Sequence, residues 1–236
     1  PDLRGRFGCG GFRLRLGFRL GHLLMLLNNF GNLRTDRADR VERGHRILED
    51  HGNVFSADLS DLPQEVLKGL PMRWEYVGKI IVIRLEPSAE PYKHRIGQTY
   101  AEELGMETVC VDRCGVTGEF RRPSMEIIYG TETESVRLEN GVYYDFDVTK
   151  VMFASGNVDE RERMKNLDCT GETVVDMFAG IGYFTLPIAK FAGPEKVIAC
   201  EKNPDSYEFL VKNIKINEVE DKVIPVLGDN RDLDYG

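Results

Sequence analysis

The chain has 236 residues, of which 42% are hydrophobic and 30% are charged, and its formal charge is −8. This composition lies near the average for globular proteins, which excludes a wholly disordered or fibrous chain, and the length suffices for one medium-sized domain or two small ones. The acidic balance excludes a generally basic coat for nucleic acid, so any such contact has to come from local patches.

Hydropathy and cysteine spacing exclude two further classes. The longest apolar stretch, at residues 23–27, is far shorter than the roughly 20 residues that span a bilayer. We therefore expect no transmembrane helix and no membrane partner. The five cysteines form neither a CxxC pair nor a Cys/His cluster with zinc spacing, so we expect no metal site, and buried free thiols in a reducing, cytoplasmic compartment.

Residues 1–60 differ in kind from the rest of the chain. They contain ten Arg and no Lys, whereas residues 61–236 contain eleven Lys and ten Arg. Segment 3–21 places Arg and Gly between Leu and Phe without a sustained helical or strand period. We expect an atypical extension that is disordered or a translation artefact, with a basic arm that contacts RNA as the alternative.

Residues 62–150 predict a small α+β domain. Helical signals at 63–67 and 91–104 flank an apolar strand-like run at 77–83. The basic triplet at 93–95 is expected to be solvated. Further β-like runs follow at 108–111, 125–129 and 142–148, and the Asn140-Gly141 pair is a strong hairpin signal.

Residues 151–236 predict the first half of a doubly wound, Rossmann-like α/β domain. Buried strands are expected at 173–178, 196–200 and 223–227, and helices at 183–192 and after Asn203. Asn203 suits the N-cap of that second helix, because a proline and an acid follow it directly. Strands that alternate with helices indicate a parallel sheet.

Acidic groups follow the second and third of these strands, at the edge where open α/β sheets bind ligands. Glu201 can accept hydrogen bonds from both ribose hydroxyls, and Asp229 with Asn230 can address an adenine amino group and ring nitrogen. A nucleoside therefore fits this edge.

The turn after the first strand narrows the choice of ligand. Gly180 and Gly182 match the first two positions of the GxGxxG fingerprint, but Thr185 stands at the third, so a pyrophosphate dinucleotide fits less well. Asp176, just before the turn, suits a cationic ligand better than phosphates. The set favours S-adenosylmethionine, with a doubly wound fold that binds no nucleotide as the alternative.

Several segments resemble archaeal tRNA-modifying enzymes of the wyosine pathway. The resemblance covers roughly residues 62–234 and rests on the stretches AEPYKHRIGQTYAEEL, GEFRRPSMEIIYG, DVTKVMFASGNVDERERM, VVDMFAGIGYFTLPIAK, ACEKNPDSYEFLVKNIKIN and GDNRD. The relatives are the tRNA guanine-N1 methyltransferase that acts beside the anticodon and its paralogue, the wybutosine-synthesising aminocarboxypropyltransferase. The resemblance implies a class I S-adenosylmethionine-dependent fold.

Three positions favour the aminocarboxypropyltransferase. The methyltransferase usually reads FSPRL where this chain has residues 153–158, more often carries Asp at the place of Glu201, and tends to read Asp-Ala-Arg at 229–231. The resemblance implies transfer of the 3-amino-3-carboxypropyl group to carbon 7 of 4-demethylwyosine in tRNA(Phe), with release of methylthioadenosine. The guanine-N1 methyltransferase remains the alternative.

The resemblance also implies roles for individual residues. Ser155 and Arg161 would lie at the methionyl end of the cofactor, with Arg161 as carboxylate clamp and Glu160 as base or orienting group. From the residues alone, an exposed, charged helix start is the favoured interpretation of residues 160–163. Arg121 and Arg122 could bind tRNA phosphates or be ordinary surface arginines. The expected cofactor-binding set is Ser155, Arg161, Asp176, Phe178, Gly180, Gly182, Glu201, Asn203, Asp229 and Asn230.

The resemblance leaves part of the family pattern unmatched. A further motif and the rest of the sheet would follow Asp229 and Asn230, whereas this sequence ends at Gly236. We therefore expect an incomplete sheet, weak stability and less than full activity. As a separate expectation, the protein is a monomer. Two rival functions are a binding module without chemistry and a nicotinamide-dependent oxidoreductase, against which Thr185 argues.

Overall fold

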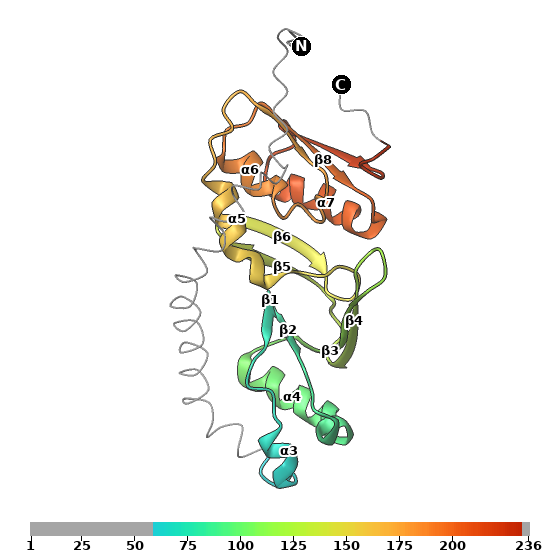
Figure 1. Ribbon diagram of the computed structural model, residues 1–236. Coiled ribbons are helices and arrows are strands. Elements are labelled where there is room, and N and C mark those ends of the chain that lie inside the picture. Colours follow the sequence, from blue (N-terminus) through green and yellow to red (C-terminus); the bar gives the residue numbers. More distant parts are fainter. Residues whose placement is uncertain (1–58, 233–236) are drawn as a thin grey trace, which may run out of the picture.

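The computed structural model describes residues 59–232, so the predictions for residues 1–58 lie outside the described part of the chain. Figure 1 shows three tiers along the length of the molecule. Helices α3 and α4 lie at one end, the β5–β6 hairpin lies in the middle, and the sheet with helices α6 and α7 forms the other end.

The N-terminal tier is a four-stranded sheet in the order β1-β2-β3-β4. Ile96 and Tyr100 of the long helix are buried with Ile81 and Val109 of the sheet, which confirms the predicted helical period. The elements of this tier are α3 (Gln64–Lys68), β1 (Glu75–Val77), β2 (Ile80–Ile83), η1 (Pro87–Tyr92), α4 (Lys93–Leu104), β3 (Thr108–Thr117) and β4 (Arg122–Tyr129).

The single strand expected at 77–83 is wrong, because a tight turn divides it. Val77 of β1 pairs with Ile80 of β2, and Gly78 between them has a φ of 55°. A Cβ at Gly78 would lie 2.1 Å from the Ser135 Oγ atom, so both the backbone and the packing require glycine there. An apolar run alone does not reveal such a turn.

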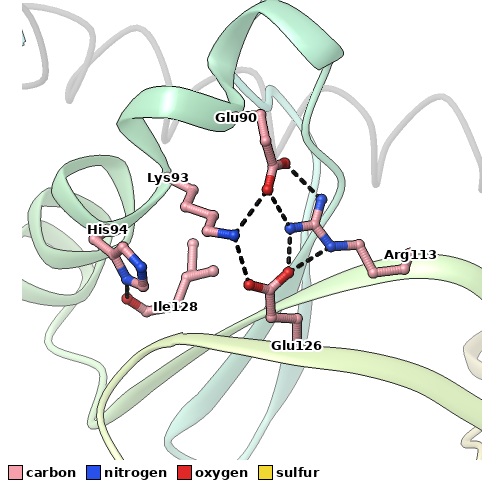
Figure 2. A network of polar contacts seen from close by, with 6 residues as sticks. All are labelled: Glu90, Lys93, His94, Arg113, Glu126 and Ile128. Carbon is pink, nitrogen blue, oxygen red and sulfur yellow. Dashed lines mark hydrogen bonds and ion pairs between the residues drawn. The ribbon is translucent and has the colours of Figure 1, made fainter.

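The basic triplet at the start of α4 is exposed at His94 and Arg95, as expected, whereas Lys93 is partly buried in a charged network (Figure 2). Lys93 Nζ lies 2.8 Å from Glu90 and 2.7 Å from Glu126, and Arg113 of β3 bridges the same two carboxylates. His94 Nδ1 lies 3.0 Å from the carbonyl oxygen of Ile128. This charged network ties α4 to both strands of the β3–β4 hairpin.

The Asn140-Gly141 hairpin prediction is confirmed. The pair joins β5 (Glu134–Glu139) to β6 (Val142–Asp147), with φ values of 52° and 82° that suit a tight primed turn. The side chains of Asn213 on α7 and of Asn217, which caps the C-terminus of that helix, accept hydrogen bonds from backbone amides of β6 at 2.7 and 2.9 Å. The hairpin, which sequence reasoning placed within the first domain, therefore packs on α7 and shares a hydrophobic core with the C-terminal tier.

The C-terminal tier is a parallel sheet in the order β7-β8-β9. Asn203 caps α7 as predicted, because its Oδ1 accepts a hydrogen bond of 3.0 Å from the Asp205 amide. Its elements are η2 (Ser155–Asn157), α5 (Val158–Lys165), β7 (Thr173–Asp176), α6 (Thr185–Phe191), β8 (Lys196–Glu201), α7 (Pro204–Ile216) and β9 (Val223–Leu227).

Two expectations drawn from composition can be compared with residues 59–232. Within this range, no helix combines the length and the hydropathy of a membrane span. The described cysteines form no disulfide, and Cys110, Cys169 and Cys200 are buried as expected. Cys114 is exposed, since it lies on the part of β3 that extends beyond the core.

Candidate functional site

The carboxyl ends of β7, β8 and β9 meet at one edge of the sheet, and the loops that follow them line a cavity of about 650 Å³. This volume is typical of small-molecule sites, and the position is the usual ligand-binding edge of an open α/β sheet. The predicted site residues in its wall are Arg121, Arg161, Phe178, Gly180, Glu201, Asn203, Asp229 and Asn230.

The two glycines after β7 have different tasks. Gly180, at a φ of 57°, lies in the cavity wall, and its amide donates to Glu201 Oε2 at 2.7 Å. A Cβ at Gly180 would meet the Tyr183 ring at 2.6 Å. Gly182 lies away from the cavity wall, and a Cβ there would lie 2.7 Å from Leu186. Gly182 therefore permits close packing of the loop on α6.

Asp176 does not lie in the cavity wall, although sequence reasoning expects it beside the ligand. It is buried, with Oδ2 accepting from the Thr185 hydroxyl at 2.7 Å and Oδ1 from the Phe178 amide at 3.2 Å. Burial raises the pKa of this carboxyl above its usual range. Asp176 thus holds the loop in shape, and Thr185, the departure from the third glycine, is its hydrogen-bond partner.

Glu201 stands at the end of β8 with its carboxylate held by two backbone amides. Oε1 accepts from the Asn203 amide at 2.6 Å and Oε2 from the Gly180 amide at 2.7 Å. Each carboxylate oxygen has two acceptor sites, so each can also accept a hydrogen bond from a ligand. This geometry suits a pair of neighbouring hydroxyl groups.

Asp229, after β9, is already surrounded by donors. Its oxygens accept from the amide, Nε and Nη2 of Arg231 at 3.1, 2.8 and 2.5 Å, and from Lys202 Nζ at 3.1 Å. Arg231 and Lys202 hold the pKa of this carboxyl well below its usual range. The next residue, Asn230, donates to the Met177 carbonyl at 2.9 Å. A ligand amino group would have to replace one of the donors on Asp229, which sequence reasoning did not foresee.

Arg161 is a buried cation in the cavity wall, with 2% of its surface exposed. Its Nε donates to Glu139 Oε1 at 2.5 Å, its Nη1 donates to the Ala154 carbonyl at 3.0 Å, and the guanidinium lies 4.8 Å from the centre of the Phe153 ring. Within the described residues, its Nη2 is buried and has no hydrogen-bond partner. Arg161 therefore combines a place in the cavity wall with a side-chain donor that has no partner among the described residues.

Ser155 and Glu160, also expected near the methionyl end, are not brought to this cavity. The Ser155 hydroxyl donates to Glu75 at 2.7 Å and lies at a second cavity of about 1120 Å³, bordered by the N-terminal sheet. Glu160 is paired with exposed Arg163 at 2.6 Å. Its surroundings match the exposed helix start that the residues alone also allowed.

The turn between β3 and β4, residues 118–121, reaches the cavity from the N-terminal tier (Figure 1). Arg121 lies in the cavity wall, whereas Arg122 does not and forms an ion pair of 3.1 Å with Asp205. Glu119 and Phe120 also line the cavity, and sequence reasoning missed both. No local pattern in the sequence indicates that a turn of the N-terminal tier contacts the C-terminal tier.

Metal chemistry has no evident site in residues 59–232. Across this range, no group of three or more His, Cys, Asp or Glu side chains is arranged to hold a metal ion.

Two family models match consecutive parts of the chain. The model of the TYW2 N-terminal domain matches residues 58–133, and the model of the TRM5/TYW2 methyltransferase domain matches residues 135–236. Their junction falls just before the β5–β6 hairpin, in agreement with the packing of that hairpin on α7.

Named relatives and solved structures agree with these models. The tRNA(Phe) (4-demethylwyosine(37)-C(7)) aminocarboxypropyltransferase of Pyrococcus horikoshii is 49% identical over 173 residues, which are 73% of this chain and 62% of the relative. The crystal structure of P. horikoshii TYW2 in complex with MeSAdo matches with a TM-score of 0.66 at 44% identity, over 81% of this chain and 66% of that one. The complex of aTrm5 with tRNALeu also gives a TM-score of 0.66, at 31% identity, over 77% of this chain and 54% of that one.

The sheet, its ligand-binding edge and these likenesses define a class I methyltransferase-like domain preceded by a smaller N-terminal domain, which confirms the predicted fold class. The chain belongs to the TYW2 family, because the models of its N-terminal domain and of the TRM5/TYW2 methyltransferase domain match consecutive parts of it. It spans less than two thirds of the length of the relatives named above.

Proposed function

We propose that this chain carries an S-adenosylmethionine-dependent transferase activity that moves the 3-amino-3-carboxypropyl group to carbon 7 of 4-demethylwyosine in tRNA(Phe), next to the anticodon. Methylthioadenosine is the second product. The name of the Pyrococcus relative supports the reaction, and the family models of the TYW2 N-terminal domain and of the TRM5/TYW2 methyltransferase domain both match this chain.

The buried guanidinium of Arg161 is the observation that carries the proposal. A buried charged donor without an acceptor costs on the order of 1–3 kcal/mol or more. The Nη2 atom of Arg161 is such a donor within the described residues, and it belongs to a residue of the cavity wall. The carboxylate of a methionine moiety supplies the missing acceptor through a charge-assisted hydrogen bond.

The other end of the cavity suits a nucleoside. Glu201 offers acceptors to the two ribose hydroxyls, and Asn230 with Asp229 offers polar contacts to adenine after Asp229 exchanges one of its present donors. Phe178 is 76% exposed in the cavity wall and presents an apolar ring to the ligand. A ligand with a nucleoside at one end and a carboxylate at the other fits both ends of the site.

These two anchors assign a positioning task to the chain. When bound, S-adenosylmethionine supplies a sulfonium whose neighbouring carbons are electrophilic. Arg161 and Glu201 hold the two ends of the molecule, so the direction in which each carbon faces is set by the protein. Glu160 is not included in the proposed site, because its carboxylate is paired with Arg163 outside the cavity.

The partner in this proposal is tRNA, which the Trm5 complex with tRNALeu supports as a partner class for this fold. We propose that Arg121 and Arg122, which are close to the cavity and to the surface, contact backbone phosphates. We further propose a cytoplasmic monomer that needs no metal ion for the transfer.

The test is incubation of the chain with tRNA(Phe) that bears 4-demethylwyosine and with cofactor labelled separately in its methyl and carboxypropyl groups. The proposal expects the carboxypropyl label in tRNA and methylthioadenosine in solution. Methyl label in tRNA would instead assign the chain to guanine-N1 methylation. Tight cofactor binding with neither label transferred would favour a binding module.

A further inference from the structure

The N-terminal tier contributes a wall to the cavity at the sheet edge. The tip of the β3–β4 hairpin, residues 118–121, supplies Glu119, Phe120 and Arg121 to the lining of this cavity. Figure 1 shows the hairpin extending from the N-terminal sheet toward α7. The cavity is therefore not made by the methyltransferase-like domain alone.

Three polar contacts hold the hairpin in this position. Glu119 accepts from Lys202 Nζ at 2.5 Å, and the Asn203 side-chain amide donates to the Phe120 carbonyl at 3.2 Å. Arg122 completes the set with its ion pair of 3.1 Å to Asp205. All three partners on the C-terminal side lie within four residues after Glu201, so the hairpin tip lies at the nucleoside end of the site.

The Phe120 side chain does not contribute to either hydrophobic core, so core packing does not explain an aromatic residue at this position. The side chain is 38% exposed. The turn around it contains Arg121 at a φ of 50°, a backbone conformation that residues other than glycine rarely adopt. Such conformations persist where surrounding contacts impose them and are frequent at ligand-binding positions.

We propose that Phe120 is a cofactor-binding residue contributed by the N-terminal domain, whose ring packs against the adenine of the cofactor while the contact between Glu119 and Lys202 keeps it in place. This inference rests on the proposed function, because it assumes a nucleoside at the sheet edge. Adenine offers an aromatic face, and stacking of a base on an aromatic side chain is a recurrent and substantial source of affinity.

The test compares two ligands that share the nucleoside. S-adenosylhomocysteine carries the amino-carboxylate end and methylthioadenosine lacks it, so contacts to adenine affect both whereas contacts to the carboxylate affect only the first. By titration calorimetry on the full chain, Phe120→Ala is expected to weaken binding of both ligands about 10-fold. Phe120→Tyr is expected to restore both affinities, because it keeps the aromatic ring.

A matched control separates this effect from general loss of an exposed ring. Phe191 is 41% exposed, close to the value for Phe120, and lies outside the cavity wall, so Phe191→Ala is expected to leave both affinities unchanged. Glu119→Gln should weaken the binding of both ligands about 3-fold, because it removes the negative charge that pairs with Lys202. Thermal unfolding of each variant checks that the fold is kept.

The outcomes are distinct for the two proposals. If wild-type protein binds both ligands and Phe120→Ala does so equally well, the inference is overturned and the proposed function stands. If Phe120→Ala weakens S-adenosylhomocysteine alone, the ring acts at the methionyl end and the assignment to adenine is wrong. If wild-type protein binds neither ligand, both the inference and the proposed function fail.

Discussion

The two walls of the cavity are built in different ways. One wall consists of loops that directly follow β7, β8 and β9, so its residues are close to one another in the parallel sheet by topology alone. The other wall consists of Arg161 and of the β3–β4 hairpin tip. A buried ion pair with Glu139 holds the Arg161 side chain in place. The comparison teaches that local motifs position the binding residues at a sheet edge. The binding residues of the opposing wall are positioned by contacts between segments distant in sequence.

The largest effect is expected at the opposing wall. Arg161→Met removes the cation from a pair whose partner, Glu139, is also buried, so the free energy of unfolding should fall by about 3–5 kcal/mol. Chemical denaturation measures this loss. Arg163→Met on the same helix is the control, because the Arg163 side chain is 55% exposed and its removal should change stability by less than about 1 kcal/mol.

The same pair of variants tests the ligand. Arg161→Met should also weaken S-adenosylhomocysteine about 100-fold while methylthioadenosine, which lacks the carboxylate, changes little. Equal weakening of both ligands would show that Arg161 supports the fold of the site and does not contact the carboxylate.

The next effect concerns the sheet-edge wall. Glu201→Gln replaces one acceptor oxygen by a donor that faces either the Gly180 amide or the Asn203 amide, so binding of both ligands should weaken about 10- to 100-fold. Glu201→Asp keeps both acceptor oxygens, so the affinity for the two ligands should fall less than in Glu201→Gln. Unchanged affinity of Glu201→Gln in calorimetry would contradict a role of this carboxylate in ribose binding.

A further effect, on the stability of the fold, separates backbone strain from packing at the turn after β7. Gly180→Ala adds a Cβ against the Tyr183 ring and should lower the free energy of unfolding by about 2–4 kcal/mol. Gly171→Ala is the matched control, since Gly171 has a φ of 72° but open space around the added Cβ. Its free energy of unfolding should fall by only about 1 kcal/mol. Equal losses of stability for the two variants in thermal unfolding would mean that the Tyr183 ring moves aside and that packing against it contributes nothing.

The smallest effect tests how the base of the hairpin is held. Arg113 and Lys93 lower the pKa of Glu90 to about 2, and Lys93 and Arg113 also lower the pKa of Glu126. Because these folded pKa values lie below the unfolded ones, the contribution to stability is present above about pH 4.5 and is lost as the pH falls toward 2.

Thermal unfolding between pH 6 and pH 3 measures this loss. Arg113→Gln should show a shallower fall in Tm over that range than the wild-type protein does, because one of the two cations that depress both carboxyl pKa values is absent. An identical slope in the two proteins would place the acid sensitivity elsewhere. The charges are partly exposed, so the difference should be small and should shrink further at high salt.

Local patterns predicted most of the elements for identifiable physical reasons. The i, i+4 spacing of Ile96 and Tyr100 marked α4, and Asn140-Gly141 marked the hairpin, because each pattern acts within a few residues. Patterns failed where a single residue changes the path, as Gly78 does between β1 and β2, and where long side chains find distant partners, as Lys93 does with Glu126.

The sequence by itself determined the parallel sheet, the glycine turn after β7 and the acidic residues after β8 and β9, because periodicity and strand-end position are local properties of the chain. Only the tertiary structure decided which candidates meet a ligand. It turned Asp176 inward onto Thr185, left Glu160 at the surface, buried Arg161 with one donor available, and brought Phe120 from another domain to the cavity. These outcomes depend on burial and on contacts between distant segments, which no local pattern contains.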